Sequence, residues 1–156
     1  MDAQLDKEET ETRNITHRQK RYFISNQHKT TPQLRKYIFG DLMAEICRAT
    51  LGNSTYLFWE QFVVKGPEVG MKFGWHQDSG TLNQDLESTP RPRVSLKIAY
   101  FLTDTTQTGR GNFYVLPGSH LQDDFPGGDR KGMVDGGIPV CVPPGTAVFF
   151  DRRLWH

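Results

Sequence analysis

The sequence predicts a single, mainly β domain that begins with one helix, and three observations support this. The 156 residues are 36% hydrophobic and 24% charged, with a net charge of +1, which is the composition of one folded globular domain. One early stretch repeats apolar residues at helical spacing, and short aromatic and β-branched runs follow it. Several short strands after one helix are typical of a β-sandwich or barrel.

The N-terminal third supplies the helix. Residues 1–30 form a polar segment whose first ~15 residues we expect to fray. The domain itself is predicted over residues 31–156. Within it, Pro32 suits a first helical turn and Gly52 ends the helix. The apolar face of this helix is predicted at Leu34, Ile38, Leu42, Ile46 and Leu51.

The strands follow in sequence, separated by segments rich in Gly, Pro, Asp and Thr. The glycine-rich segment at 126–137 is predicted to be a mobile loop, and Asn112, Gly118 and Ser119 are predicted to shape the backbone of a turn. The predicted strands are TYLFWEQFVV, MKFGWHQD, RVSLKIAYFLT, NFYVLP, IPVCVP and TAVFFDRRLWH.

Composition argues against several classes of protein. The 19 Lys plus Arg against 18 Asp plus Glu argue against binding to nucleic acid through phosphate contacts. No apolar run approaches the ~20 residues that span a membrane, and the opening MDAQLDKEETETR is unlike a signal peptide. We therefore expect a cytoplasmic protein that binds neither nucleic acid nor membrane.

A histidine and a carboxylate two positions apart suggest a metal site. In an extended strand, the side chains of His76 and Asp78 point to the same face, so both can reach one metal ion. His156 ends a later apolar run and can supply a third ligand. Two His and one Asp on one face of a metal leave three open positions, which is typical of non-haem Fe(II) oxygenases. Trp75 and Trp155 precede ligands and are predicted to pack behind them.

Three sequence blocks together carry a family resemblance. They are EQFVVKGPEVGMKFGWHQDSG at 60–80, GRGNFYVLPGSH at 109–120 and PPGTAVFFDRRLWH at 143–156. In order and separation they resemble the phytanoyl-CoA dioxygenase family of Fe(II)- and 2-oxoglutarate-dependent oxygenases, over roughly residues 35–156. The resemblance implies a double-stranded β-helix, the cupin-like jelly roll, with the metal inside one mouth.

The resemblance also implies roles for individual residues. The iron ligands and catalytic residues are His76, Asp78 and His156. Tyr100 is expected either to line the 2-oxoglutarate pocket or to be plain core. Lys65 and Gln61 fall in the block that the family keeps near the cofactor, although a lysine in a KGPEVG turn is commonly just solvated. Ascorbate is a further expected reductant.

The family pattern extends beyond this chain. In the family, an arginine roughly ten residues after the distal histidine pairs with the far carboxylate of 2-oxoglutarate, and the sequence here stops at His156. We therefore expect the last core strand to be missing and the domain to be incomplete. Arg152 shares the predicted inward face, but it precedes the ligand in sequence.

The expected activity is hydroxylation of a small organic substrate with O₂, giving succinate and CO₂ as coproducts. Halogenation is disfavoured because Asp78 fills the position that a halide would take. Two alternatives remain: a metal-binding jelly roll that is non-catalytic, needs no 2-oxoglutarate or is an inactive truncated fragment, and an interaction domain in which these residues are incidental. The sequence indicates neither the substrate nor the oligomeric state.

Overall fold

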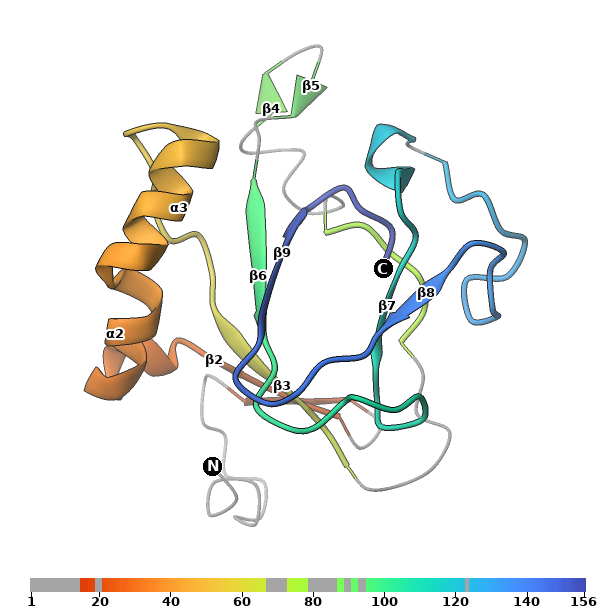
Figure 1. The fold of residues 1–156 in the computed structure, drawn as a ribbon, viewed down its shortest axis with the longest axis horizontal. Coiled ribbons are helices and arrows are strands. Elements are labelled where there is room, and N and C mark those ends of the chain that lie inside the picture. Colours follow the sequence, from red (N-terminus) through yellow and green to blue (C-terminus); the bar gives the residue numbers. More distant parts are fainter. Residues whose placement is uncertain are drawn as a thin grey trace. The chain divides into compact units, whose positions relative to one another are not determined.

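The chain consists of two compact units, Met1–Met71 and Lys72–His156, and each is described by itself (Figure 1). In the computed structural model used here, strands in both units pair antiparallel. No helix among the described residues is long and apolar enough to span a membrane. The residues that the structure describes are 15–18, 21–66, 73–78, 87–88, 91–92, 95–122 and 124–156.

The first unit contains a three-stranded sheet in the order β1-β2-β3. These strands are β1 (Ile15–Arg18), β2 (Arg21–Ser25) and β3 (Gln61–Lys65). On β2, Ile24 pairs with Phe62 of β3 and is buried. No strand is predicted at 15–25 from the sequence, because β2 pairs with a strand far along the chain and the local sequence pattern does not reveal such a partner.

The predicted single helix is two helices. After the short 3₁₀ turn η1 (Gln27–Lys29), α2 spans Pro32–Phe39 and α3 spans Asp41–Leu51. The one-helix prediction is wrong at Gly40, whose backbone is extended with φ −69° and ψ 160°. A Cβ atom at Gly40 would overlap the carbonyl oxygen of Lys36, so this close approach of two backbone segments requires glycine.

The break at Gly40 changes which helical face is buried. Pro32 at the first turn and Gly52 at the end, with φ +90°, confirm the predicted boundaries. However, Leu42 is 71% exposed, and its neighbour Met43 is the buried residue of α3 at 8%. The prediction for Leu42 is wrong because the helical period restarts after Gly40.

The second unit is built from short antiparallel strand pairs. Figure 1 shows β6 beside β9 and β7 beside β8. These pairs confirm the mainly β prediction, and each strand is shorter than the apolar run that predicted it. The elements are β4 (Glu87–Ser88), β5 (Arg91–Pro92), β6 (Leu96–Tyr100), β7 (Phe113–Val115), the 3₁₀ turn η2 (Ser119–Leu121), β8 (Ile138–Val140) and β9 (Ala147–Asp151).

Two predicted strand segments are not regular strands. Residues 73–78 are irregular, and β9 ends at Asp151, so His156 follows a turn rather than ending a strand. Paired backbone hydrogen bonds nevertheless hold these segments together. The N–H of His76 donates to the carbonyl of His156 at 2.8 Å, and the reverse bond is 3.0 Å. The N–H of Asp78 donates to the carbonyl of Arg152 at 2.9 Å.

The core of the second unit lies directly behind this pairing. Trp75, Leu116 and Trp155 form a buried cluster, which agrees with the prediction that both tryptophans face away from the ligands. Trp75 also anchors the segment predicted to be a mobile loop: its backbone N–H donates to the Arg130 carbonyl, and its indole N–H donates to the Gly132 carbonyl. The glycine-rich segment is therefore tied to the core.

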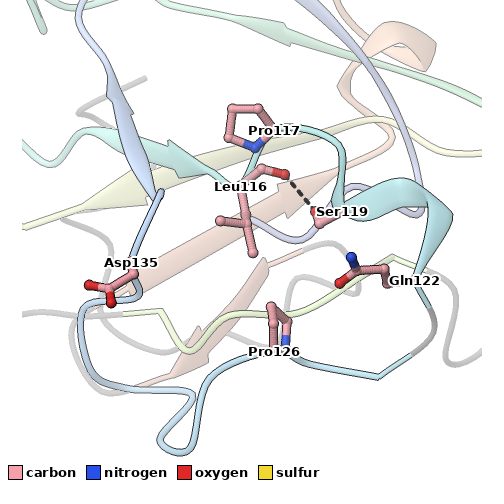
Figure 2. A pocket seen from close by; sticks show the side chains of 6 residues that line it. All are labelled: Leu116, Pro117, Ser119, Gln122, Pro126 and Asp135. Atoms are coloured by element: carbon pink, nitrogen blue, oxygen red, sulfur yellow. Dashed lines mark hydrogen bonds between the residues drawn. The ribbon is translucent and has the colours of Figure 1, made fainter.

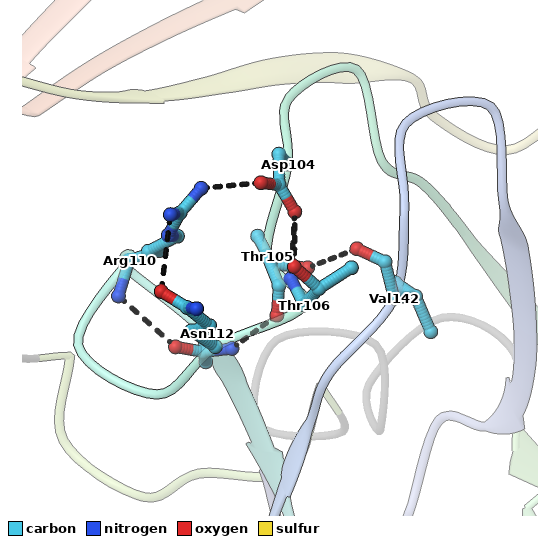
Figure 3. Close-up of polar contacts among 7 residues, drawn as sticks. Asp104, Thr105, Thr106, Arg110, Asn112 and Val142 are labelled. Atoms are coloured by element: carbon cyan, nitrogen blue, oxygen red, sulfur yellow. Dashed lines mark hydrogen bonds and ion pairs between the residues drawn. The ribbon is translucent and has the colours of Figure 1, made fainter.

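A polar cluster shapes the turn between β6 and β7 (Figure 3). The Asp104 carboxylate accepts hydrogen bonds from the hydroxyl and backbone N–H of Thr106, and these lower the pKa of Asp104. Arg110 pairs with the same carboxylate. The Asn112 side chain donates to the Thr105 carbonyl and accepts from the N–H of Arg110. As predicted, Asn112 shapes the backbone, here immediately before β7.

Candidate metal centre

A tight turn positions the segment that ends in His156. Leu116, Pro117, Gly118 and Ser119 form the turn, with φ +80° at Gly118 and a hydrogen bond from the Ser119 N–H to the Leu116 carbonyl. The buried Ser119 hydroxyl donates to the Leu116 carbonyl at 2.6 Å and accepts the backbone N–H of Trp155 at 2.9 Å. One hydroxyl therefore fixes the residue next to His156, as expected for a backbone-shaping role.

His76, Asp78 and His156 come together as the sequence predicts. The Nε2 atom of His76 lies 3.7 Å from one carboxylate oxygen of Asp78, and the Nε2 atom of His156 lies 3.7 Å from the other. One ligand atom from each residue lies within 4.8 Å of the others. Across the described residues, this is the only cluster of three or more His, Cys, Asp or Glu side chains with that property.

Backbone carbonyls select the tautomer of both histidines. The Nδ1 atom of His76 is 2.9 Å from the Gly74 carbonyl oxygen, and Nδ1 of His156 is 2.7 Å from that of Leu154. A carbonyl only accepts, so in each neutral ring Nδ1 carries the proton and the Nε2 lone pair faces Asp78. Hydrogen bonds to the ring nitrogen that does not bind the metal orient metal-binding histidines in this way. The donor set therefore fits a divalent metal ion.

The site is buried on one side and open on the other. The His156 side chain is 7% exposed and that of His76 is 43% exposed. Burial lowers the pKa of His156, and the nearby His76 lowers it further. A lowered pKa favours the neutral imidazole, which is the form that binds metal. Access to the site is from the His76 side.

Two phenylalanine rings pack against the buried histidine. The ring centroids of Phe113 on β7 and Phe150 on β9 lie 5.2 and 5.1 Å from that of His156. The two phenylalanine rings also contact each other at 5.1 Å. These rings form an apolar wall that limits the rotation of His156.

Lys97 also lies at this site, although it is not among the residues predicted from the sequence. Its Nζ atom lies 3.0 Å from the Asp78 carboxylate, and its side chain is 35% exposed. Lys97 faces Phe150 across the β6–β9 pair. The signal in the sequence is a lone charge inside the apolar run SLKIAYF, on the face of the strand opposite Tyr100.

The other predicted cofactor residues belong to the strands β3 and β6. Tyr100 is on β6 but, by alternation, on the face opposite Lys97, and its cross-strand partner is Ala147. Gln61 and Lys65 are the first and last residues of β3 in the other unit. Cofactor contacts by Tyr100, Gln61 and Lys65 stay predictions.

A separate small cavity lies between the turn and the glycine-rich segment (Figure 2). It measures about 220 Å³ and contains no residue of the triad. Its one ionisable lining residue is Asp135, so it lacks a cluster of side chains like that of the candidate metal centre. It is lined by Leu116, Pro117, Ser119, Gln122, Pro126 and Asp135.

Comparison with known proteins identifies the family of the chain. The sequence profile of the phytanoyl-CoA dioxygenase (PhyH) family matches residues 1–156. Two curated relatives are similar: the ectoine dioxygenase of Sphingopyxis alaskensis at 23% identity and that of Bordetella bronchiseptica at 27%. Each alignment covers 83% of this chain and 49% of the relative.

The chain thus spans about half the length of the curated relatives it matches. No solved structure gives a significant match. The family profile covers every residue, including the three side chains that converge at the candidate metal centre. On this evidence, the chain belongs to the phytanoyl-CoA dioxygenase family.

Proposed function

We propose that this chain carries the iron site of an Fe(II)- and 2-oxoglutarate-dependent dioxygenase that hydroxylates a small organic substrate with O₂. One observation carries the proposal: His76, Asp78 and His156 converge with both Nε2 atoms facing the carboxylate. Two histidines and one carboxylate leave open positions on a metal for a cosubstrate and oxygen. Membership of the family and the ectoine dioxygenase relatives support the same chemistry.

Each residue at the site has a proposed task. His76, Asp78 and His156 would hold Fe(II), which with 2-oxoglutarate supplies the oxidising chemistry and yields succinate and CO₂. The Gly74 and Leu154 carbonyls keep the two imidazoles in the metal-binding tautomer. The remaining sequence predictions, a double-stranded β-helix, ascorbate as reductant and a cytoplasmic location, are part of the same proposal.

The phenylalanine wall supports the chemistry in a second way. Phe113 and Phe150 cover the buried side of His156 and keep water from that side of the ligand. Excluding water strengthens the electrostatic interactions at the site and limits side reactions of the oxidant. The more exposed His76 side is where a substrate would enter.

Anaerobic titration tests the proposal. The chain is loaded with Fe(II) without oxygen, and 2-oxoglutarate is then added while the visible spectrum is recorded. A charge-transfer band is expected, because the 2-oxo acid chelates the metal. Asp78→Ala should weaken Fe(II) binding by more than about 100-fold, beyond the effect typical of outer-sphere partners.

Asp124→Ala is the matched control, since Asp124 is an exposed carboxylate outside the triad. It should bind Fe(II) like the unmodified chain. Iron binding without a band would favour a metal-binding module that needs no 2-oxoglutarate. Iron binding unaffected by Asp78→Ala would refute the site itself.

A further inference from the structure

Arg130 contacts both of the tryptophans that precede the histidines of the candidate metal centre. Its backbone carbonyl accepts a hydrogen bond from the N–H of Trp75 at 2.7 Å. Its guanidinium carbon lies 5.0 Å from the centre of the Trp155 ring. Trp75 and Trp155 belong to segments far apart in the sequence, so Arg130 bridges the two segments that carry His76 and His156.

Arg130 belongs to a short strap, residues 125–132, that lies against the core behind the candidate metal centre. At one end of the strap, the Phe125 ring packs on the Trp155 ring, with the two centroids 4.9 Å apart. At the other end, the Gly132 carbonyl accepts the indole N–H of Trp75 at 3.0 Å. The strap therefore holds each tryptophan by two contacts, and Arg130 supplies one contact of each pair.

The rings of the two tryptophans are held in different ways. The indole N–H of Trp75 has an acceptor in the strap, whereas that of Trp155 is buried and has no hydrogen-bond acceptor in the part of the chain that the structure describes. The Trp155 ring is therefore held by packing, to which Arg130 contributes. A guanidinium group is attracted to the face of an aromatic ring, and its apolar stem covers the ring surface.

The strap gives the two histidine segments a second point of attachment. The first is the reciprocal pair of backbone hydrogen bonds between His76 and His156. Two segments joined at one point can still rotate about it, whereas a second joint behind the first fixes the angle between them. A metal site requires its ligands to be held within about 0.5 Å of the productive geometry. The strap therefore helps to set the positions of the two imidazoles.

We infer that Arg130 is a positioning residue for the metal centre, and that closure of the strap and metal binding stabilise each other. The inference rests on the proposed function only in requiring that His76, Asp78 and His156 bind a metal ion. Apparent affinity falls with the fraction of chains whose ligands are in place, so a looser strap weakens metal binding. By linkage, the bound ion then favours the closed strap by the same factor.

The first test measures Fe(II) affinity by calorimetry without oxygen. Arg130→Met keeps an apolar stem and the backbone carbonyl but removes the charge over the Trp155 ring. It is expected to weaken Fe(II) binding about two- to fivefold, the size of a cation–π contact at an exposed site. Arg130→Lys should recover most of the affinity, because it restores a cation over the ring. Lys131→Met is the matched control, since Lys131 is the exposed neighbour of Arg130.

The second test follows hydrogen exchange at two backbone amides of the same unit. The Gly132 N–H lies in the strap and donates to the Asp129 carbonyl at 3.1 Å. The Thr105 N–H lies outside the strap and donates to the Val142 carbonyl at 3.0 Å, which makes it the control. Saturating Fe(II) should slow exchange at Gly132 about two- to fivefold more than at Thr105. This difference should be smaller in Arg130→Met, whose strap has lost a contact with Trp155.

Two results would overturn the inference alone. If Arg130→Met binds Fe(II) as tightly as Lys131→Met does, the Arg130 side chain does not position the ligands. If Fe(II) slows exchange at Gly132 and Thr105 by the same factor, the ion stabilises the unit as a whole and is not coupled to the strap. Failure of the unmodified chain to bind Fe(II) would instead refute the proposed function, and the inference with it.

Discussion

The Ser119 hydroxyl allows a test of how the fold holds the candidate metal centre in place. It accepts the backbone N–H of Trp155 at 2.9 Å and donates to the Leu116 carbonyl at 2.6 Å. Ser119→Ala removes both bonds with little change in volume. The Leu116 carbonyl still accepts a hydrogen bond from the backbone N–H of residue 119. The main effect is therefore that the backbone N–H of Trp155 loses its acceptor.

The expected cost follows from burial. Ser119 is 2% exposed and Trp155 is also buried, so water cannot replace the missing hydroxyl. A buried donor left without a partner costs about 1–3 kcal/mol. For a chain of this size, about 2 kcal/mol lowers Tm by roughly 4–8 °C. Because Trp155 precedes His156, we also expect weaker Fe(II) binding.

Thermal and urea unfolding of the metal-free chain measure the cost, and Fe(II) titration measures the effect on the site. Ser54→Ala is the control, since Ser54 is exposed and surface changes of this kind usually alter stability by less than about 0.5 kcal/mol. If Ser119→Ala unfolds like Ser54→Ala, the hydroxyl does not hold the Trp155 backbone and the reasoning is wrong.

Two further predictions concern the same unit. Gly118→Ala should destabilise the chain by about 1–2 kcal/mol in urea unfolding, because φ is +80° there, whereas Gly128→Ala has open space and no such strain and should be neutral or slightly stabilising. Equal effects of the two changes would contradict this. Separately, the lowered pKa of His156 means that the unfolded chain takes up a proton more readily than the native one. The free energy of unfolding of the metal-free chain should therefore decrease as pH drops below about 6.5. In the His156→Asn variant, measured in parallel, the part of this decrease that comes from His156 should be absent.

The convergence of His76, Asp78 and His156 was predictable from sequence because its signal is local chemistry. The spacing of His76 and Asp78 places both on one side of an extended segment, and the segment need not be a regular strand for this to hold. The distal His156 was found by its place at the end of an apolar run. The structure adds what sequence cannot show, namely the reciprocal backbone bonds between His76 and His156.

Other features required three-dimensional information. The break at Gly40 depends on the close approach of the Lys36 carbonyl, which the sequence does not show. Apolar residues at helical spacing therefore predicted one continuous helix, and this placed Leu42 on the buried face although it is exposed. The pairing of β2 with β3 joins distant segments. Lys97 was not predicted at the site because the face of β6 that points toward the site depends on the pairing with β9. The alternation of side chains along β6 does not by itself show which of its two faces this is.

The reciprocal backbone bonds between His76 and His156 have a thermodynamic consequence for metal uptake. In an unfolded chain, a metal ion that bound both residues would have to close a loop of 80 residues, at an entropic cost of about 4 kcal/mol. In the native chain the fold has already closed that loop through the His76–His156 pair. The native chain should therefore bind the ion about 1,000-fold more tightly than the unfolded chain. A bound metal ion would then stabilise the unit that holds it against unfolding.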